Sequence, residues 1–414
     1  MRQKTDIIMF RIIFLHRRAV MAYIVFTSAL FLFVTLDGSE RQKPDVNARI
    51  IFFPPALKQA RQIDDFVEFV EFSKRNTTLT LSTVSESTRL LLRQEKCHLP
   101  DLIYPTMIKT NTSLERVPKI VHLTWKSEKV PAKAVPFIKK WQTTNPDWEV
   151  WFWTDKNTAE FMEINFPDYY AVFTSYKSNI ERADAMRYFI IYQFGGVYAD
   201  LDIEPVKSLN PLLDKYTCLL SQEPYEHGNL MRIEMLNNFG FLACNAFMMC
   251  RRQHPFFKFA LDSLKVHKDN PAGVLHTTGP VFLSKVYRKY IESFIIGLCR
   301  DKASRIGVAP AEFFMPKYDT LFNSTVVFAC SRFSAFIYGL TYGQKLICDD
   351  LYSRRFRNKI LKVTFTDHHH FHTWAEGKDL YFEKGFDFNS SNIRAILPKA
   401  VVKEFSLQNN SLKT

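Results

Sequence analysis

The sequence predicts an α/β fold in which helices flank a mostly parallel β-sheet. Apolar runs of strand length at 117–125 and 148–153 are separated by a helix-like segment at 134–144. A longer helical segment at 179–194 then leads through a Gly-Gly pair into the short apolar run 197–199. Because strands that alternate with helices build parallel βα units, this order favours a parallel sheet covered by helices.

The N-terminus predicts a membrane anchor. Ala19–Leu36 is a run of 18 residues without a formal charge, which is the short end of the length that spans a bilayer. Arg17 and Arg18 precede this run, and Asp37 follows it. Since positive charge remains cytoplasmic, we expect an uncleaved, single-pass type II signal anchor and a lumenal chain in the Golgi or the ER.

The expected domains follow from this anchor and from composition. They are a cytosolic tail at 1–18, a transmembrane signal anchor at 19–36, a lumenal stem at 37–115, a folded domain at 116–385 and a C-terminal tail at 386–414. Proline-punctuated and Ser/Thr-rich segments in the stem are typical of a linker, which would hold the folded domain away from the bilayer.

Composition and cysteine usage restrict the class of protein. With 47% hydrophobic residues the chain can bury a large core. Its net charge of +13 is explained first by a solvated basic surface, and attraction for anionic ligands such as nucleotide sugars is the functional alternative. The sequence has no helix-turn-helix or aromatic-basic motif that would support nucleic acid as a partner. All seven cysteines follow the anchor, so some should pair in an oxidising compartment and at least one is left over, with the connectivity open. Five N-x-S/T sequons also support a lumenal location: Asn76, Asn111, Asn323, Asn389 and Asn409.

The strongest chemical signal lies at 179–204. The apolar run 197–199 ends in Asp200 and Asp202, where the predicted strand gives way to a loop. Ligands of open α/β sheets bind at the carboxyl ends of strands, and two aspartates one residue apart can share a divalent cation there. Oxygen ligands suit Mg²⁺ or Mn²⁺, which in turn suit the phosphates of a substrate. Taken alone, the same two aspartates also fit an ordinary polar turn.

The helix before these aspartates carries a second polar pair. Asp184 and Arg187 are three residues apart and therefore share one helix face. An acid and a guanidinium side by side near a metal could hold sugar hydroxyls. We therefore treat Asp184, Arg187, Asp200 and Asp202 as the candidate catalytic residues.

Residues 182–202 read R-A-D-A-M-R-Y, six further residues, and then G-G-V-Y-A-D-L-D. This stretch resembles the signature of glycosyltransferases with a sugar-binding region containing a DXD motif. That family includes fungal inositol-phosphoceramide mannosyltransferases, the initiating α-1,6-mannosyltransferase of the yeast Golgi, and animal α-1,4-N-acetylglucosaminyl- and galactosyltransferases. The resemblance covers roughly 117–374, and it implies a GT-A-type nucleotide-sugar transferase fold with its catalytic domain at 116–385.

The resemblance also implies residues that bind the nucleotide-sugar donor. In the family the first strand carries the nucleotide base at its end, although a core strand with an aromatic plug explains 117–125 equally well. Asn245 precedes an H-P-F-F marker, and as a buried amide it is either structural or a ligand contact. Gly279 lies in a T-T-G-P loop similar to one in the family. The implied donor-binding set is His122, Thr124, Trp125, Asp184, Arg187, Tyr198, Asn245, Gly279 and Trp374.

The segment 364–374 reads TFTDHHHFHTW and is similar to an H-H-x-x-x-S-W cluster of the family, but one residue shorter. On a strand, His368, His370 and His372 would share one face. Because neutral imidazole can bind Mn²⁺, we expect His370, and next His369, to complete the metal site of the two DXD aspartates. A surface polyhistidine patch is the alternative interpretation.

The resemblance implies a retaining transfer of a hexose from a nucleotide sugar, with Mn²⁺ (or Mg²⁺) as cofactor. The motifs are closest to those of the inositol-phosphoceramide mannosyltransferases. This favours GDP-mannose as donor and a glycolipid or glycan as acceptor, with 225–239 as an acceptor-side loop. Transfer of galactose or N-acetylglucosamine from a UDP-sugar in α-1,4 linkage is the first alternative. A non-catalytic sugar-binding scaffold on the same fold is the alternative from another class.

Overall fold

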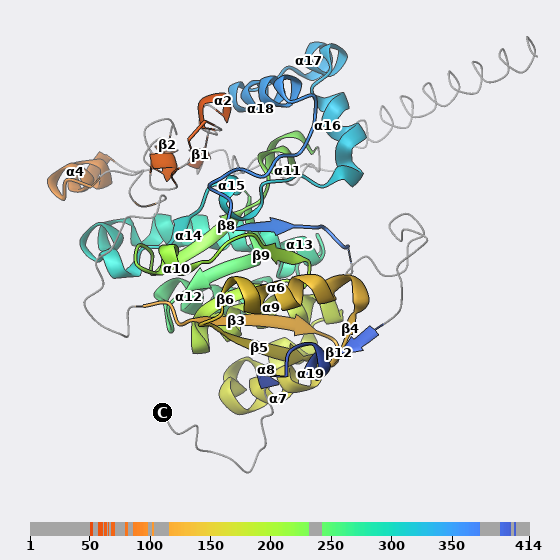
Figure 1. Ribbon diagram of the computed structural model, residues 1–414. Helices are drawn as coiled ribbons and strands as arrows, with labels where there is room; N and C mark the ends of the chain where they lie inside the picture. The colour runs from red at the N-terminus through yellow and green to blue at the C-terminus, as the bar shows by residue number, and fades with distance from the viewer. Residues whose placement is uncertain are drawn as a thin grey trace, which may run out of the picture. The chain divides into compact units, whose positions relative to one another are not determined.

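A mixed sheet is the central element of the fold. The computed structural model describes residues 116–231, 242–372 and 390–398, together with parts of 50–102 and 401–402. Seven strands form one sheet in the order β10 (Gly307–Val308), β8 (Cys218–Gln222), β9 (Ala243–Cys250), β6 (Gly196–Ala199), β3 (Ile120–Trp125), β5 (Glu149–Thr154) and β13 (Val401–Val402) (Figure 1). Strand β9 runs antiparallel to β6 and β8, whereas the other neighbouring pairs are parallel. The predicted α/β fold with a mostly parallel sheet is confirmed.

Short antiparallel pairs lie outside this sheet. They are β1 (Ile50–Phe52) with β2 (Leu79–Leu81), β4 (Lys129–Pro131) with β12 (Ser390–Asn392), and β7 (Ile203–Pro205) with β11 (Thr366–His368). The pair β7 and β11 matters most for function, because it brings the segment after the DXD aspartates beside the C-terminal histidines.

Helices cover the sheet and extend beyond its ends. In chain order they are α2 (Leu57–Ala60), α4 (Glu86–Gln94), α6 (Val135–Thr144), α7 (Asp155–Asn165), α8 (Pro167–Ser175), α9 (Asn179–Phe194), α10 (Asn210–Leu213), α11 (Tyr225–Leu230), α12 (Pro255–His267), α13 (Val274–Thr277), α14 (Pro280–Arg300), α15 (Ala311–Phe314), α16 (Asn323–Ala329), α17 (Arg332–Tyr338), α18 (Tyr342–Ser353) and α19 (Ile393–Ile396). Helix α12 packs against both α9 and α14, and α6 and α7 pack against β5.

Local sequence signals explain where the central helix α9 begins and ends. Ser178 and Glu181 form a reciprocal capping box at its start. At its end, Gly195 and Gly196 have φ values of 65° and 93°. A Cβ atom would lie 2.7 Å from the Arg252 amide nitrogen at the first position and 2.6 Å from the Ile120 carbonyl oxygen at the second. The Gly-Gly pair therefore turns the chain directly from helix into the buried strand β6.

The described parts of 50–102 belong to the same folded unit as the sheet, which spans 49–414. Leu57, Phe69 and Leu92 are buried in the main core, and a disulfide joins Cys97 to Cys299 in α14. The sequence predicts a linker here from polar and proline-rich composition. Instead, widely spaced apolar residues anchor these pieces to the domain, and their spacing is too irregular to signal packing in advance.

Cysteine pairing agrees with the oxidised state that the sequence predicts. The disulfides are Cys97–Cys299, Cys218–Cys250 and Cys330–Cys348, and Cys244 is a buried free thiol. One prediction is wrong: the first part of the proposed acceptor-side loop is the helix α11, which is largely buried. The polar sequence conceals this helix because its partners come from α16 and α18, far along the chain.

The expected cytosolic tail and membrane anchor lie outside the described residues, as do 373–389 and 403–414. Within the part of the chain that the structure describes, no single helix combines the length and the apolar character needed to cross a bilayer. Two helical segments, Thr320–Ala329 and Arg332–Tyr338, meet both criteria when joined, but a 63° bend separates them. Of the five sequon asparagines, Asn323 is described, as the exposed first residue of α16.

Candidate active site

Asp200 and Asp202 lie in the tight turn between β6 and β7, at the carboxyl end of β6. The Asp200 N–H donates to the carbonyl of Ala246 over 2.9 Å, and the Ile203 N–H donates to the carbonyl of Asp200 over 3.0 Å. These bonds fix the turn against the neighbouring strand β9. The structure therefore puts both carboxylates at the sheet edge where open α/β folds bind ligands.

Arg187 links Asp184, on the same helix, to Asp200. Its Nη2 atom lies 2.7 Å from Asp184 Oδ1, and its Nη1 atom lies 3.4 Å from Asp200 Oδ1. Nη1 also donates to the Asn245 carbonyl over 2.7 Å, and the guanidinium lies over the ring of Tyr198 at 4.7 Å. The charge of Arg187 is thus buried and already paired with carboxylates, so its direct role is to hold Asp184 and Asp200 in place.

Neutral side chains complete the support of Asp184. Asn245 Nδ2 donates to Asp184 Oδ1 over 3.1 Å, and Thr278 Oγ1 donates to Asp184 Oδ2 over 3.4 Å. Tyr188 donates to the Thr278 carbonyl over 2.6 Å, which fixes the loop before α14. The T-T-G-P loop therefore reaches the site through Thr278, while Gly279 allows close packing, because a Cβ there would lie 2.9 Å from Leu275 Cα.

Asp200 is supported from the first strand of the sheet. Tyr198 OH lies 2.7 Å from Asp200 Oδ1 and 2.9 Å from Thr124 Oγ1. Since the carboxylate can only accept, Tyr198 donates to Asp200 and accepts from Thr124. Burial raises the pKa of Asp184 to about 6, and burial together with Asp202 raises the pKa of Asp200, although Arg187 opposes both shifts.

Asp202 faces His368. The pairing of His368 with Ile203 in the β7–β11 ladder brings the imidazole Nε2 to 3.2 Å from Asp202 Oδ2. The Phe371 N–H also donates to Asp202 Oδ2, over 2.8 Å. Burial would raise the pKa of Asp202, but His368 and this N–H hold it well below its usual range. Burial opposes protonation of His368, yet Asp202 raises the pKa of that imidazole to about 9.

His370 lies behind His368, on the same side of the segment. Its ring centroid is 4.1 Å from that of His368, and its Nε2–H donates to the Lys317 carbonyl over 3.2 Å. Burial and the neighbouring His368 lower the pKa of His370 to about 3, so it remains neutral. The described contacts of His370 are with His368, Lys317, His227 and His372, and none is with the DXD aspartates.

His369 points to the other side, as strand alternation predicts. Its Nε2 lies 2.7 Å from Glu204 Oε2, and its ring stacks on Phe137 with centroids 4.4 Å apart. Glu204, Asp367 and His369 are close enough together to hold an ion. However, Lys140 lies 2.6 Å from Glu204, and Lys317 pairs with Asp367, so these carboxylates already have cationic partners.

The segment that carries Asp200 and Asp202 is similar to a known protein family. Residues 131–219 match the family described as glycosyltransferase sugar-binding region containing DXD motif. This segment is similar to that glycosyltransferase family.

The chain is 35% identical over 188 residues to Inositol phosphoceramide mannosyltransferase 3 of Schizosaccharomyces pombe, which covers 45% of this chain and 49% of that protein. It is also 35% identical over 179 residues to Mannosyl phosphorylinositol ceramide synthase SUR1 of Saccharomyces cerevisiae, covering 42% of each. Among solved structures, PaToxG Glycosyltransferase matches with a TM-score of 0.30 and 14% identity, over 45% of this chain and 78% of that one. The chain thus spans about half the length of the curated relatives it matches.

The structure brings most of the predicted glycosyltransferase residues together, with clear exceptions. His122 is fully buried: Trp153 Nε1 donates to its Nδ1 over 3.2 Å, and its Nε2–H donates to the Gly195 carbonyl over 2.8 Å. Only the last residues of β3 reach the sheet edge, so Thr124 contacts the DXD network while His122, two residues earlier, belongs to the core. Trp125 ends β3 and is partly exposed, and Trp374 lies outside the described residues.

The side chains around the DXD pair fit a divalent cation. Asp200 and Asp202 offer hard oxygen ligands, and His368 offers a nitrogen ligand beside them, a combination that suits Mn²⁺. His368 Nδ1 is a buried polar atom without a hydrogen-bond partner among the described residues. The proton on His368 therefore provides the positive charge that faces Asp202 in the metal-free chain.

Some residues at the site were missed by reasoning from sequence. The strand pattern places His368 on one face with His370 and His372 but does not single it out as a ligand, and the T-T-G-P motif points to Gly279 rather than to Thr278. Glu223 and His227 gave no signal at all. Glu223 accepts from His227 Nδ1 over 2.9 Å, and the Asp319 N–H donates to His227 Nε2 over 3.0 Å.

Proposed function

We propose that this chain is a metal-dependent, retaining hexosyltransferase that transfers mannose from GDP-mannose to a glycolipid of the inositol-phosphoceramide type, or to a glycan. The observation that carries the proposal is the arrangement of Asp200, Asp202 and His368 beside the Asp184–Arg187 pair, inside a segment of the DXD family. The names of the curated relatives support mannose and a sphingolipid acceptor.

The DXD aspartates and His368 would hold Mn²⁺ (or Mg²⁺), which supplies positive charge to the diphosphate of the leaving nucleotide. His368 takes the ligand position that the sequence predicts for His370 and His369, because it is the histidine that faces Asp202. A cation there would displace the proton from His368, since the ring nitrogen that faces Asp202 must be free to act as a ligand.

Asp184 would orient the donor sugar. Arg187, Asn245 and Thr278 fix its carboxylate, and an ionised carboxylate accepts hydrogen bonds from sugar hydroxyls. Thr124 and Tyr198 sit at the end of β3 and on β6, where they would border the nucleotide. Retention of configuration and the GT-A fold type are inferred from the family.

We further propose a single-pass type II protein of the Golgi or the ER, with the folded unit in the lumen. Three disulfides within the described residues support an oxidising compartment. The anchor proposed at 19–36 rests on its run of 18 uncharged residues and on the arginines before it.

The test is release of nucleotide from GDP-mannose, UDP-galactose and UDP-N-acetylglucosamine by the full-length chain, with and without Mn²⁺. We expect Mn²⁺-dependent release from GDP-mannose, lowered at least about 100-fold by Asp202→Asn, because an amide cannot replace an anionic ligand. Asp147→Asn is the matched control, since Asp147 lies before β5, at the opposite ends of the strands, and pairs with Lys119. This change should leave release unaltered.

The outcomes separate the alternatives. Release from a UDP-sugar alone would keep the transferase and replace the donor. Metal-dependent binding of a nucleotide sugar without any release, with acceptor lipid present, would favour a non-catalytic sugar-binding protein. Well-folded protein that neither binds nor cleaves any donor would exclude the proposal.

A further inference from the structure

Helices α16 and α17, together with the short turn 320–322 before α16, expose a set of large apolar side chains, which we term the α16–α17 corner. Its members are Leu321, Phe328, Phe333, Phe336, Ile337 and Tyr338. Phe336 is 85% exposed and Phe333 is 63% exposed. Single exposed apolar residues are common on protein surfaces, but a cluster of this size on successive turns marks an interaction surface. Figure 1 shows α16, α17 and α18 beyond the edge of the sheet, away from β5.

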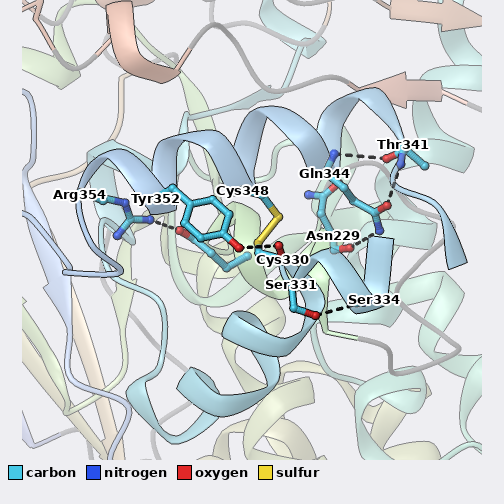
Figure 2. Close-up of a disulfide and its surroundings, with 10 residues drawn as sticks. Asn229, Cys330, Ser331, Ser334, Thr341, Gln344, Cys348, Tyr352 and Arg354 are labelled. Carbon is cyan, nitrogen blue, oxygen red and sulfur yellow. Dashed lines mark hydrogen bonds and ion pairs between the residues drawn. A yellow bond between two sulfur atoms is a disulfide. The ribbon is translucent and has the colours of Figure 1, made fainter. Parts of the chain in front are cut away.

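The α16–α17 corner is held firmly in place. The disulfide Cys330–Cys348 ties the bend between the two helices to α18, and Tyr352 donates to the Cys330 carbonyl over 2.7 Å (Figure 2). Ser331 caps α17 through the Ser334 N–H over 3.1 Å. These contacts hold the bend on its inner side, while the aromatic side chains of the corner remain exposed.

The charges in the stretch of sequence that contains the corner are mostly positive. From 320 to 362 the only acidic residues are Asp349 and Asp350, and Asp350 already pairs with Arg354 over 2.8 Å. Exposed basic residues in the same stretch are Arg332, Lys345, Arg355, Arg357, Lys359 and Lys362. An apolar face with a cationic border is complementary to a surface that is apolar inside and anionic at its edge.

We propose that the α16–α17 corner is a binding surface for a lipid bilayer with anionic head groups. A 63° bend separates the two helical segments, and Ala329 and Cys330 at its vertex are buried, which favours a position in the interface over a straight span. Pairing with a second copy of this chain is disfavoured, because it would bring two cationic borders together.

This surface begins close to the candidate active site. The ring of Phe322, just before α16, packs edge-on against the ring of His227, with their centroids 6.1 Å apart. Tyr318 OH donates to Asn323 Oδ1 at the start of α16 over 2.8 Å. If the acceptor is a membrane lipid, the corner would keep the DXD site at the bilayer that contains it. That consequence rests on the proposed function, whereas bilayer contact itself does not.

Photo-cross-linking in the full-length chain tests the proposal. p-Benzoylphenylalanine replaces Phe336 in one sample and Val266, which lies on α12 and is 80% exposed, in the other. With phosphatidylcholine vesicles that contain phosphatidylserine, we expect lipid adducts at position 336 in several-fold excess over position 266. Any attachment through the N-terminal segment is the same in both samples, so the difference reports local contact and requires no turnover.

A second comparison tests the cationic border. The double change Arg332→Glu and Lys345→Glu, or the omission of phosphatidylserine, should lower adduct formation at position 336 several-fold. Both residues are exposed, and an unchanged thermal unfolding transition would show that the variant remains folded. Equal adduct yields at 336 and 266, adducts to a second protein chain, or no response to either change of charge would overturn the proposal.

Discussion

At the scale of single residues, the site depends on charges that compensate one another in a buried setting. Arg187 lies between Asp184 and Asp200, and His368 balances Asp202. In each pair the cation opposes the protonation that burial alone would favour. The second pair differs in kind, because its cation is a titratable imidazole that a metal ion can replace.

This difference predicts how the stability of the metal-free chain depends on pH. The pKa of His368 is about 9 in the folded chain, against an ordinary value of 6.5. Its contribution is therefore fully present below pH 6.5 and is lost as the pH rises through about 9. The free energy of unfolding should fall over this range by up to about 3 kcal/mol. Urea unfolding with a metal chelator at successive pH values measures this slope.

The variant His368→Gln should flatten that slope, because glutamine does not titrate. His267→Gln is the control, since His267 Nδ1 contacts only the Ser263 carbonyl of its own helix among the described hydrogen bonds. Addition of Mn²⁺ should also raise the melting temperature more at pH 9 than at pH 6.5, because metal and proton compete for His368. An equal metal effect at both pH values would contradict a ligand role for His368.

At the scale of elements, α9, the Gly-Gly turn and β6 form one unit. This unit brings Asp184 and Arg187 of the helix close to Asp200 at the end of the strand. The helix delivers Asp184 and Arg187, and the strand delivers Asp200. Their approach requires the backbone to reverse within Gly195 and Gly196, where a side chain would meet neighbouring backbone atoms. The short Gly195-Gly196 connection therefore sets the distance between the side chains of α9 and those at the end of β6.

Gly196→Ala should accordingly destabilise the fold by about 2 to 4 kcal/mol, because it adds left-handed strain to a 2.6 Å clash with the Ile120 carbonyl. Gly297→Ala is the matched control, since its Cβ meets nothing within 4 Å in the interior of α14. That change should stabilise the chain by about 0.5 to 1 kcal/mol. Urea denaturation of both variants gives the comparison, and similar effects at the two positions would refute this account of the turn.

At the scale of the whole folded unit, the segment before the first sheet strand is structural. Cys97 and Cys299, 202 residues apart, tie it to α14, and its apolar side chains enter the main core. The region assigned to a stem from composition thus contributes to the folded core.

Removing the Cys97–Cys299 disulfide should lower the free energy of unfolding. Chain entropy predicts a loss of about 5 kcal/mol for Cys97→Ala with Cys299→Ala, against about 3 kcal/mol for Cys330→Ala with Cys348→Ala, whose residues are 18 apart. Non-reducing urea denaturation measures both. Limited proteolysis should cut the first variant within 50–102 before the rest of the chain. If that variant is as stable and as resistant as the native chain, this region is a linker after all.

The sequence by itself determined the features that are close together along the chain. The α/β class, the helix that ends in Gly-Gly, and the positions of Asp184, Arg187, Asp200 and Asp202 all follow from local periodicity and local turn chemistry. These signals are reliable because a helix face and a strand end are set by residues within a few positions of each other.

Only the tertiary structure decided which distant side chains meet these carboxylates. The β7–β11 register selects His368 over its two neighbours, because a shift of one residue would turn a different ring toward Asp202. The depth of His122 along β3 and the folding of 50–102 onto α14 likewise depend on contacts between remote segments. No pattern within one segment predicts such contacts, because each contact also depends on the residues of a distant segment.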